Sequence, residues 1–140
     1  MIKTAAFILG LTMFPLLASE DTSQLSQQLI YPIGSFQATE QYDNIHVVPL
    51  NSNKDASDYV IFIKEKVKAH YHAEHTELVY ILEGTATMWL GDEVKKVTTG
   101  DYIRIPPMVI HSVEVTSEMP LKVLSIQTPE FKGKDRHLVD

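Results

Sequence analysis

Residues 69–84 read AHYHAEHTELVYILEG and combine a strand-like apolar pattern with three histidines and three glutamates. A strand that only fills a core needs none of these titratable side chains. In an extended chain alternate residues share a face, so His70 and His72 project the same way, about 7 Å apart. Glu77 follows five residues later, within reach of the pair if the chain bends at residues 73–76. Two imidazoles and a carboxylate on one face are typical of a site for a divalent metal ion.

The whole chain has the size and composition of one domain. Its 140 residues, of which 44% are hydrophobic, are enough for a single buried core. The formal net charge of -6, without clustered Lys and Arg, argues against nucleic acid as a partner. The sequence contains no cysteine, which excludes disulfides, thiolate ligands and a cysteine nucleophile.

The N-terminal residues 1–18 place Lys3 before an apolar run, after which the composition becomes polar. This order is typical of a secretory signal peptide. The run is shorter than the about 20 apolar residues of a membrane span. We therefore expect cleavage after Ala18 or Ser19, export to the periplasm or the exterior, and no membrane attachment afterwards. An uncleaved anchor is the alternative. Residues 19–44 are expected to form an arm or linker, with one short helix near residues 24–30.

Short β-rich runs separated by turn residues follow this arm. The runs span residues 45–50, 59–67, 78–84, 85–90, 94–97, 101–107, 111–116 and 121–127. Eight short strands without a long amphipathic helix between them predict an all-β fold, an antiparallel barrel or double-sheet jelly roll. We place this barrel at residues 45–128 and a C-terminal tail at residues 129–140.

Several of the predicted strands are apolar on both faces. In residues 78–84, Val79 and Ile81 share the face of Glu77, while Leu78 and Tyr80 point the other way and are equally apolar. One face fills the barrel, so the other needs cover from a second sheet or a second subunit. Cover by a second sheet and cover by a second subunit are both compatible with the sequence, and we expect a homodimer.

The histidine-rich segment resembles the first sequence motif of the cupin superfamily. Its intervals are kept by His70, His72, Glu77 and Gly84, and residues 100–115 match the second motif with Gly100, Pro106 and His111. The resemblance covers about residues 45–128. It implies a cupin barrel, which is an antiparallel double-stranded β-helix of the jelly-roll type. It also implies that His70, His72, Glu77 and His111 are the ligands of a metal ion.

The chain departs from the family pattern at three positions, none of which is a ligand. Lys64 and Met108 stand where the family has glycines, and Val115 stands where it has an asparagine. A glycine at position 108 can take a positive φ at little cost, whereas methionine cannot. We therefore expect a reshaped turn before His111.

Four other polar residues have less specific roles. His75 lies between the histidine pair and Glu77, where we expect it to support the bend or the ligands, with a substitute ligand as the alternative. His46 and His137 belong to no pattern and are expected to be solvated. Glu74 is expected to be a surface charge, and the alternative is that it orients a ligand imidazole.

The residues that could contact a substrate each have two alternative roles. Met88 and Trp89 are expected to pack in the core or at its rim, with a substrate platform as the alternative. Arg104 is expected to be a solvated strand cation, and the alternative is a clamp for an anionic substrate. Tyr80 and Tyr102, together with His75, are weak candidates for acid or base work, so no catalytic residue is assigned.

The implied ligand set leaves about two positions open on a six-coordinate ion, which is typical of a catalytic site. Mn, Fe, Co, Ni, Cu and Zn all fit these ligands. Three functions follow: a small metal-dependent enzyme of the oxygenase or isomerase type, a non-catalytic protein that binds a metal or a small sugar-like or acidic ligand, and a structural or partner-binding module. The ligand set argues against the third. Substrate and ligand remain unknown.

Overall fold

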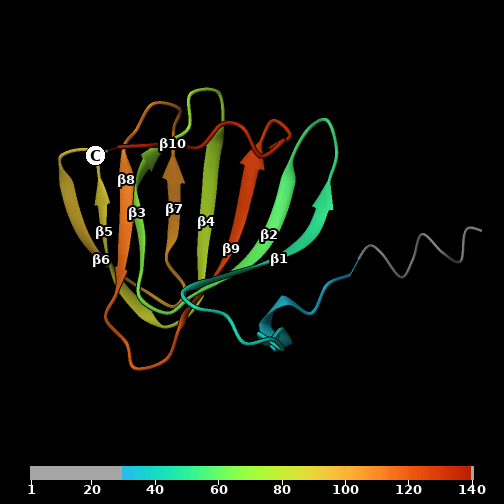
Figure 1. Cartoon of the computed structure of the whole chain (residues 1–140), viewed down its shortest axis with the longest axis vertical. Helices are drawn as coiled ribbons and strands as arrows, with labels where there is room; N and C mark the ends of the chain where they lie inside the picture. Colours follow the sequence, from blue (N-terminus) through green and yellow to red (C-terminus); the bar gives the residue numbers. More distant parts are fainter. Residues whose placement is uncertain (1–29, 140) are drawn as a thin grey trace, which may run out of the picture. The chain divides into compact units, whose positions relative to one another are not determined.

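The structure is a computed structural model that describes residues 30–139, and it consists of two facing antiparallel β-sheets (Figure 1). The expected signal peptide and the helix near residues 24–30 lie outside the described residues, apart from Ile30. A short 3-10 helix, η1 (Ile33–Ser35), precedes ten strands. They are β1 (Ile45–Ser52), β2 (Ser57–Ile63), β3 (Lys66–Tyr71), β4 (Thr76–Glu83), β5 (Thr85–Leu90), β6 (Glu93–Thr98), β7 (Tyr102–Ile105), β8 (His111–Val115), β9 (Leu121–Thr128) and β10 (His137–Leu138).

The strands pair in the order β1-β2-β9-β4-β7 in one sheet and β10-β3-β8-β5-β6 in the other. Consecutive strands often lie in different sheets, so the chain crosses between layers as a jelly roll does. The predicted all-β jelly-roll class is confirmed. Among the described residues, no helix has the length and apolar composition needed to cross a membrane.

The prediction of one continuous strand over residues 59–67 is wrong. The chain leaves the first sheet after β2 and enters the second at β3, and the crossing is made by exposed residues at positions 64 and 65. Asn44 holds the crossing: its carbonyl accepts from the Lys64 N–H at 2.8 Å, and its side-chain Oδ1 accepts from the Glu65 N–H at 2.9 Å. Strand propensity continues through the crossing, which is why the sequence pattern did not reveal it.

The core lies between the two sheets and contains the alternate residues of their inner faces. Its buried members are Ile63, Val79, Ile81, Ala86, Met88, Val97, Ile103, Ile105, Val113, Leu121 and Val123. The predicted alternation in β4 is confirmed, because Glu77, Val79 and Ile81 are buried together while Tyr80 is exposed on the other side.

The outer face of the first sheet is covered by the chain itself at one end. Lys122 is 1% exposed there, and its ammonium donates to the Gly34 carbonyl and the Glu83 carboxylate, each at 2.8 Å. Toward the β7 edge of the same face, Tyr80 and Tyr102 pair with each other and remain exposed. The homodimer stays a prediction, and these two tyrosines lie on the face for which it was made.

Gly84 joins β4 to β5 in a space without room for a side chain. Its φ is +89°, and an added Cβ would lie 3.1 Å from the Leu121 Cα and 3.2 Å from the Pro120 carbonyl oxygen. Gly100 has a similar φ of +95° but has nothing within 4 Å of the same position. Substituting each glycine by alanine therefore distinguishes the cost of a positive φ, which both positions share, from the cost of steric overlap, which arises only at Gly84.

We predict that Gly84→Ala lowers the free energy of unfolding by about 2–4 kcal/mol, because it adds overlap to the cost of positive φ. Gly100→Ala is the matched control and should cost about 1–2 kcal/mol from φ alone. Urea denaturation of both variants measures the difference. Equal losses would show that the close approach of Gly84 to Leu121 does not constrain the fold.

Candidate metal centre

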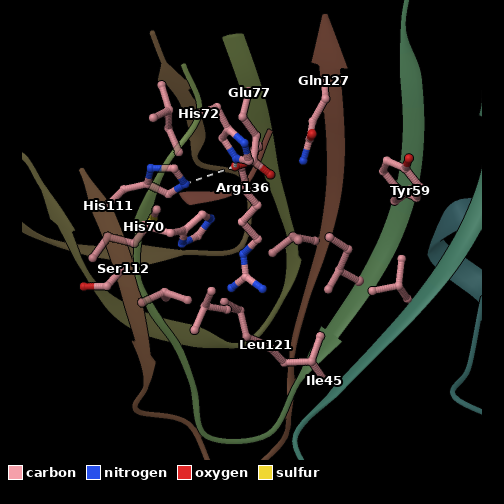
Figure 2. A pocket seen from close by; sticks show the side chains of 18 of the residues that line it. Ile45, Tyr59, His70, His72, Glu77, His111, Ser112, Leu121, Gln127 and Arg136 are labelled. Carbon is pink, nitrogen blue, oxygen red and sulfur yellow. Dashed lines mark ion pairs between the residues drawn. The ribbon is translucent and has the colours of Figure 1, made fainter. Parts of the chain in front are cut away.

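The four residues implied as ligands come together inside the barrel (Figure 2). His70 lies at the end of β3, His72 directly after it, Glu77 in β4 and His111 at the start of β8. All four are buried, and one potential ligand atom from each lies within 4.8 Å of the others. The chain bends after β3, at residues 72–75, and this bend brings Glu77 back to the histidine pair.

Backbone carbonyls orient all three imidazoles. The Nδ1 atoms of His70, His111 and His72 contact the carbonyl oxygens of Lys68 (2.8 Å), Val109 (2.9 Å) and Asp135, respectively. A carbonyl can only accept, so each Nδ1 carries the hydrogen. Each Nε2 is then left with a free lone pair, which is the form that binds a metal ion.

The Nε2 atoms of His72 and His111 are buried and have no hydrogen-bond partner among the described residues. They lie 3.5 and 3.3 Å from Oε2 of Glu77. Ligand atoms about 2.1 Å from one ion lie about 3.0–3.4 Å apart at tetrahedral or octahedral angles. Buried polar atoms without partners are rare, so this cluster needs a further occupant. Three imidazole nitrogens and one carboxylate oxygen fit a borderline divalent ion.

Glu77 is held as a carboxylate. Burial alone would raise its pKa, but the facing His111 and His72 rings and the Ser125 hydroxyl lower the pKa well below its usual range. Ser125 donates to Oε1 at 2.5 Å, which leaves Oε2 facing the histidines. One oxygen is thus used for positioning and the other is available to an ion.

The histidines differ in their affinity for protons. Burial, together with the charge of His111, lowers the pKa of His70 to about 4. Burial also acts to lower the pKa of His72, but the Glu77 carboxylate and the Asp135 carbonyl outweigh it and raise that pKa above its usual value. In the metal-free protein His72 therefore holds a proton at a pH where His70 is neutral.

A cavity of about 300 Å³ adjoins the cluster and is lined mainly by apolar side chains of both sheets. Met88 contributes to this lining, whereas Trp89 points to the outside of the second sheet and lines a separate surface pocket. The polar lining residues beyond the four-residue cluster are Tyr59, Ser112, Gln127 and Arg136. The cavity is therefore an apolar chamber with the cluster at one side (Figure 2).

Residues 129–139, which we name the C-terminal strap, cross from β9 to the edge of the second sheet, where β10 pairs with β3 (Figure 1). Asp135 fastens the strap: its carboxylate accepts the N–H groups of Ala73, Glu74 and His75 at 2.8, 2.9 and 3.1 Å. Burial would raise the pKa of Asp135, but the bond to the His75 ring and these N–H groups hold it well below its usual range. Neither Asp135 nor β10 was predicted.

His75 is not placed to bind the ion. Its Nδ1 contacts the Asp135 carboxylate at 2.5 Å, and its Nε2 contacts the Glu130 carbonyl at 2.9 Å, so both nitrogens are occupied. The expectation that His137 is solvated is wrong in part: it is exposed, but it contacts Asp135 at 3.1 Å and stacks on Tyr71. Glu74 is exposed, as expected.

Three further expectations need correction. Tyr80 and Tyr102 are exposed on the outer face of the first sheet, so neither is an acid or base for this cavity. His46 is half-buried between Tyr42 and Phe62, with ring centroids 5.4 and 6.1 Å away, and is not fully solvated.

Arg104 faces the same outer side, as the expected solvated cation, because its neighbours in β7 are the buried Ile103 and Ile105. The arginine that lines the cavity is Arg136, in the strap.

The expectation of a reshaped turn before His111 is not borne out at Met108, which keeps the backbone conformation that a glycine would adopt there. Met108 has a φ of 67°, in the left-handed region that methionine rarely adopts. Its N–H donates to the His72 carbonyl at 2.7 Å, so the turn is tied directly to a member of the cluster. The Met108 side chain is exposed and does not enter the cavity.

Known proteins resemble this chain in sequence and in fold. A family model described as a cupin domain matches residues 60–127, which contain all four residues of the cluster. An uncharacterized protein of Aquifex aeolicus (strain VF5) is 37% identical over 93 residues, covering 66% of this chain and 76% of that protein.

Quercetin 2,3-dioxygenase of Bacillus subtilis (strain 168) is 29% identical over 92 residues, covering 62% of this chain and 27% of that enzyme. Among solved structures, an uncharacterized protein with a double-stranded β-helix domain from Klebsiella pneumoniae superposes with a TM-score of 0.68 at 15% identity. That match covers 80% of this chain and 97% of the other. The structural match supports the fold alone.

We predict that the ring protons of His70 and His72 titrate on opposite sides of the ordinary histidine pKa of about 6.5 in metal-free protein. NMR titration of the Cε1–H signals measures both. Protonation of His70 lags behind that of the unfolded chain, so its contribution to stability is lost as the pH falls from about 6.5 toward 4. The contribution of His72 has the opposite sign and is lost as the pH rises through its raised pKa. Coincident titrations would contradict the arrangement of the cluster.

Proposed function

Because the chain belongs to the cupin family, we propose that it is a metal-dependent enzyme of the oxygenase type, which binds one divalent ion in the barrel and acts on a small substrate in the adjoining cavity. One observation carries the proposal: three oriented imidazoles and a carboxylate converge, buried, at the side of an apolar cavity. His70, His72, Glu77 and His111 are the proposed ligands.

The residues of the chain would perform three tasks in this enzyme. The three histidines present neutral Nε2 atoms, and Glu77 contributes one negative charge, so about two positions of a six-coordinate ion face the cavity. The apolar lining limits water near the reacting groups. When bound, the ion would supply Lewis acidity toward a substrate oxygen and, if redox-active, electron transfer with dioxygen.

The cavity lining favours oxygenase over isomerase chemistry. An isomerase that moves a proton on carbon needs a general base beside its substrate. Among the described lining residues, every histidine and carboxylate belongs to the proposed ligand set. The similarity to quercetin 2,3-dioxygenase supports the same choice. Zinc lacks redox chemistry, so Mn, Fe, Co, Ni or Cu is then the functional ion.

A non-catalytic protein that binds a metal or a small ligand is the second candidate, since the same cavity and cluster serve binding alone. Export and a homodimeric state remain parts of the proposal. They rest on residues 1–18 and on the exposed apolar outer face, respectively.

We predict that metal raises the melting temperature of the protein through binding to the native state. His72→Ala should lose most of this rise, because it removes a ligand. His75→Ala is the matched control: it should lower the baseline stability but keep the rise, since neither His75 nitrogen faces the cluster. Thermal melts of chelated and metal-loaded protein provide the comparison. An equal metal response in His72→Ala and wild type would show that the ligands are assigned wrongly.

The metal-induced rise should also shrink on acidification from about pH 7.5 to about pH 5.5. Protons compete with the ion for imidazole, and the raised pKa of His72 brings this competition close to neutral pH. His70, with a pKa of about 4, should not compete in this range. Melts at the two pH values check the direction. A rise that grows on acidification would contradict the assignment.

We predict oxygen uptake when protein loaded with Mn, Fe, Co, Ni or Cu is given quercetin as a probe substrate. His111→Ala should abolish this uptake, and Zn-loaded protein should show none, because zinc cannot exchange electrons with dioxygen. An oxygen electrode measures the rates. If the loaded protein binds quercetin but consumes no oxygen with any of the five ions, the non-catalytic candidate replaces the oxygenase.

A further inference from the structure

We propose that Arg136 binds the anionic group of the natural ligand, so that this ligand is a small organic acid with an apolar body. The inference deepens the proposed function and rests on its use of the barrel cavity as the ligand site. It is carried by the position of Arg136, by the charge balance of the cavity and by an unpaired amide oxygen of Gln127, the cross-strand neighbour of Glu77.

Arg136 reaches the cavity from the C-terminal strap (Figure 2). Its two neighbours in the chain are fixed: Asp135 is fastened to the bend after β3, and His137 pairs with Tyr71 in β10. The guanidinium points from this anchored backbone into the space between His70 and the apolar wall (Figure 2). An anchored backbone reduces the entropy lost when the side chain binds a ligand.

No acidic side chain of residues 30–139 forms an ion pair with Arg136. The neighbouring Asp135 carboxylate is engaged by His75, His137 and backbone N–H groups. An exposed arginine is often merely solvated, and Arg136 as a whole is exposed. Its side chain nevertheless lines the cavity. A dissolved anion can therefore reach the guanidinium directly from solvent.

The net charge of the cavity depends on the ion, because the charges of Glu77 and Arg136 alone cancel. Glu77 is the one acidic side chain among its lining residues. With a divalent ion bound, the ion, Glu77 and Arg136 together leave two net positive charges beside an apolar lining. Charge in such surroundings is costly unless it is compensated. A carboxylate between the ion and Arg136 compensates one of these two charges, and a guanidinium matches a carboxylate with two parallel hydrogen bonds.

Gln127, the cross-strand neighbour of Glu77, offers a buried acceptor that needs a hydrogen-bond donor. It is 7% exposed, lines the cavity, and its Oε1 has no hydrogen-bond partner among the described residues. A hydroxyl group on the ligand would satisfy this acceptor. The remaining lining is apolar, and about 300 Å³ corresponds to roughly ten water volumes. The expected ligand is therefore a compact hydroxy acid with a branched or aromatic body.

The test measures binding of mandelate, phenylacetate and 2-hydroxyisovalerate, and of their uncharged amides, by calorimetry on Zn-loaded and metal-free protein. Each amide differs from its acid mainly in charge. We expect at least one acid to bind wild type at least about 10-fold more tightly than its amide. Arg136→Gln should remove that preference and Arg136→Lys should restore part of it, since lysine keeps the charge without the fork. Arg104→Gln is the matched control and should change nothing, because Arg104 faces the outside.

The proposal is overturned if no acid binds wild type below about 10 mM, if acids and amides bind equally, or if Arg104→Gln weakens binding as much as Arg136→Gln. Melting temperature and metal content of each variant, measured before and after titration, show that fold and ion are intact. Metal content also separates the two proposals. Protein that holds no ion at His70, His72, Glu77 and His111 contradicts the proposed function, while a preference for acids that persists in metal-free protein and depends on Arg136 still supports this inference.

Discussion

The hydrogen bond from each buried imidazole Nδ1 to a backbone carbonyl is the interaction on which the candidate site depends. Buried polar groups without partners are costly, so three histidines inside an apolar barrel need acceptors for their N–H groups. His70 and His111 find theirs two residues earlier in their own strand segments, whereas His72 uses Asp135, 63 residues away. Together these bonds select the tautomer and direct every Nε2 to one point.

The C-terminal strap connects the orientation of the cluster with the chemistry of the cavity. Asp135 binds the bend after β3, supports His75 and accepts from His72, and the next residue is the arginine that lines the cavity. The strap is therefore part of the site, although the four cluster residues come from the barrel strands and the bend after β3. The strap lies outside residues 60–127, which match the cupin domain. Changes in such a segment can alter the ligand preference of a site without changing its metal ligands.

Strand alternation accounts for the parts of the fold that sequence analysis predicted well. Residues 76–81 follow strict alternation, so the burial of Glu77 with Val79 and the exposure of Tyr80 could be predicted. Alternation fails where the chain passes between sheets, because residues 64 and 65 interrupt a run of equal strand propensity. It also fails for β10, whose two residues are too few to show a period.

The sequence by itself determined which residues could form the cluster. The intervals between His70, His72 and Glu77 are local: alternation gives the two histidines one direction, and the short bend between β3 and β4 returns Glu77 to them from the facing sheet. The sequence did not determine the turn before His111, where a reshaped backbone was expected and Met108 instead has a φ of 67°. Tertiary structure alone decided that Arg136 and not Arg104 lines the cavity, and that Asp135 completes the orientation of His72. Both depend on contacts between segments about 60 residues apart in the chain, and such contacts leave no periodic pattern in the sequence from which they could be inferred.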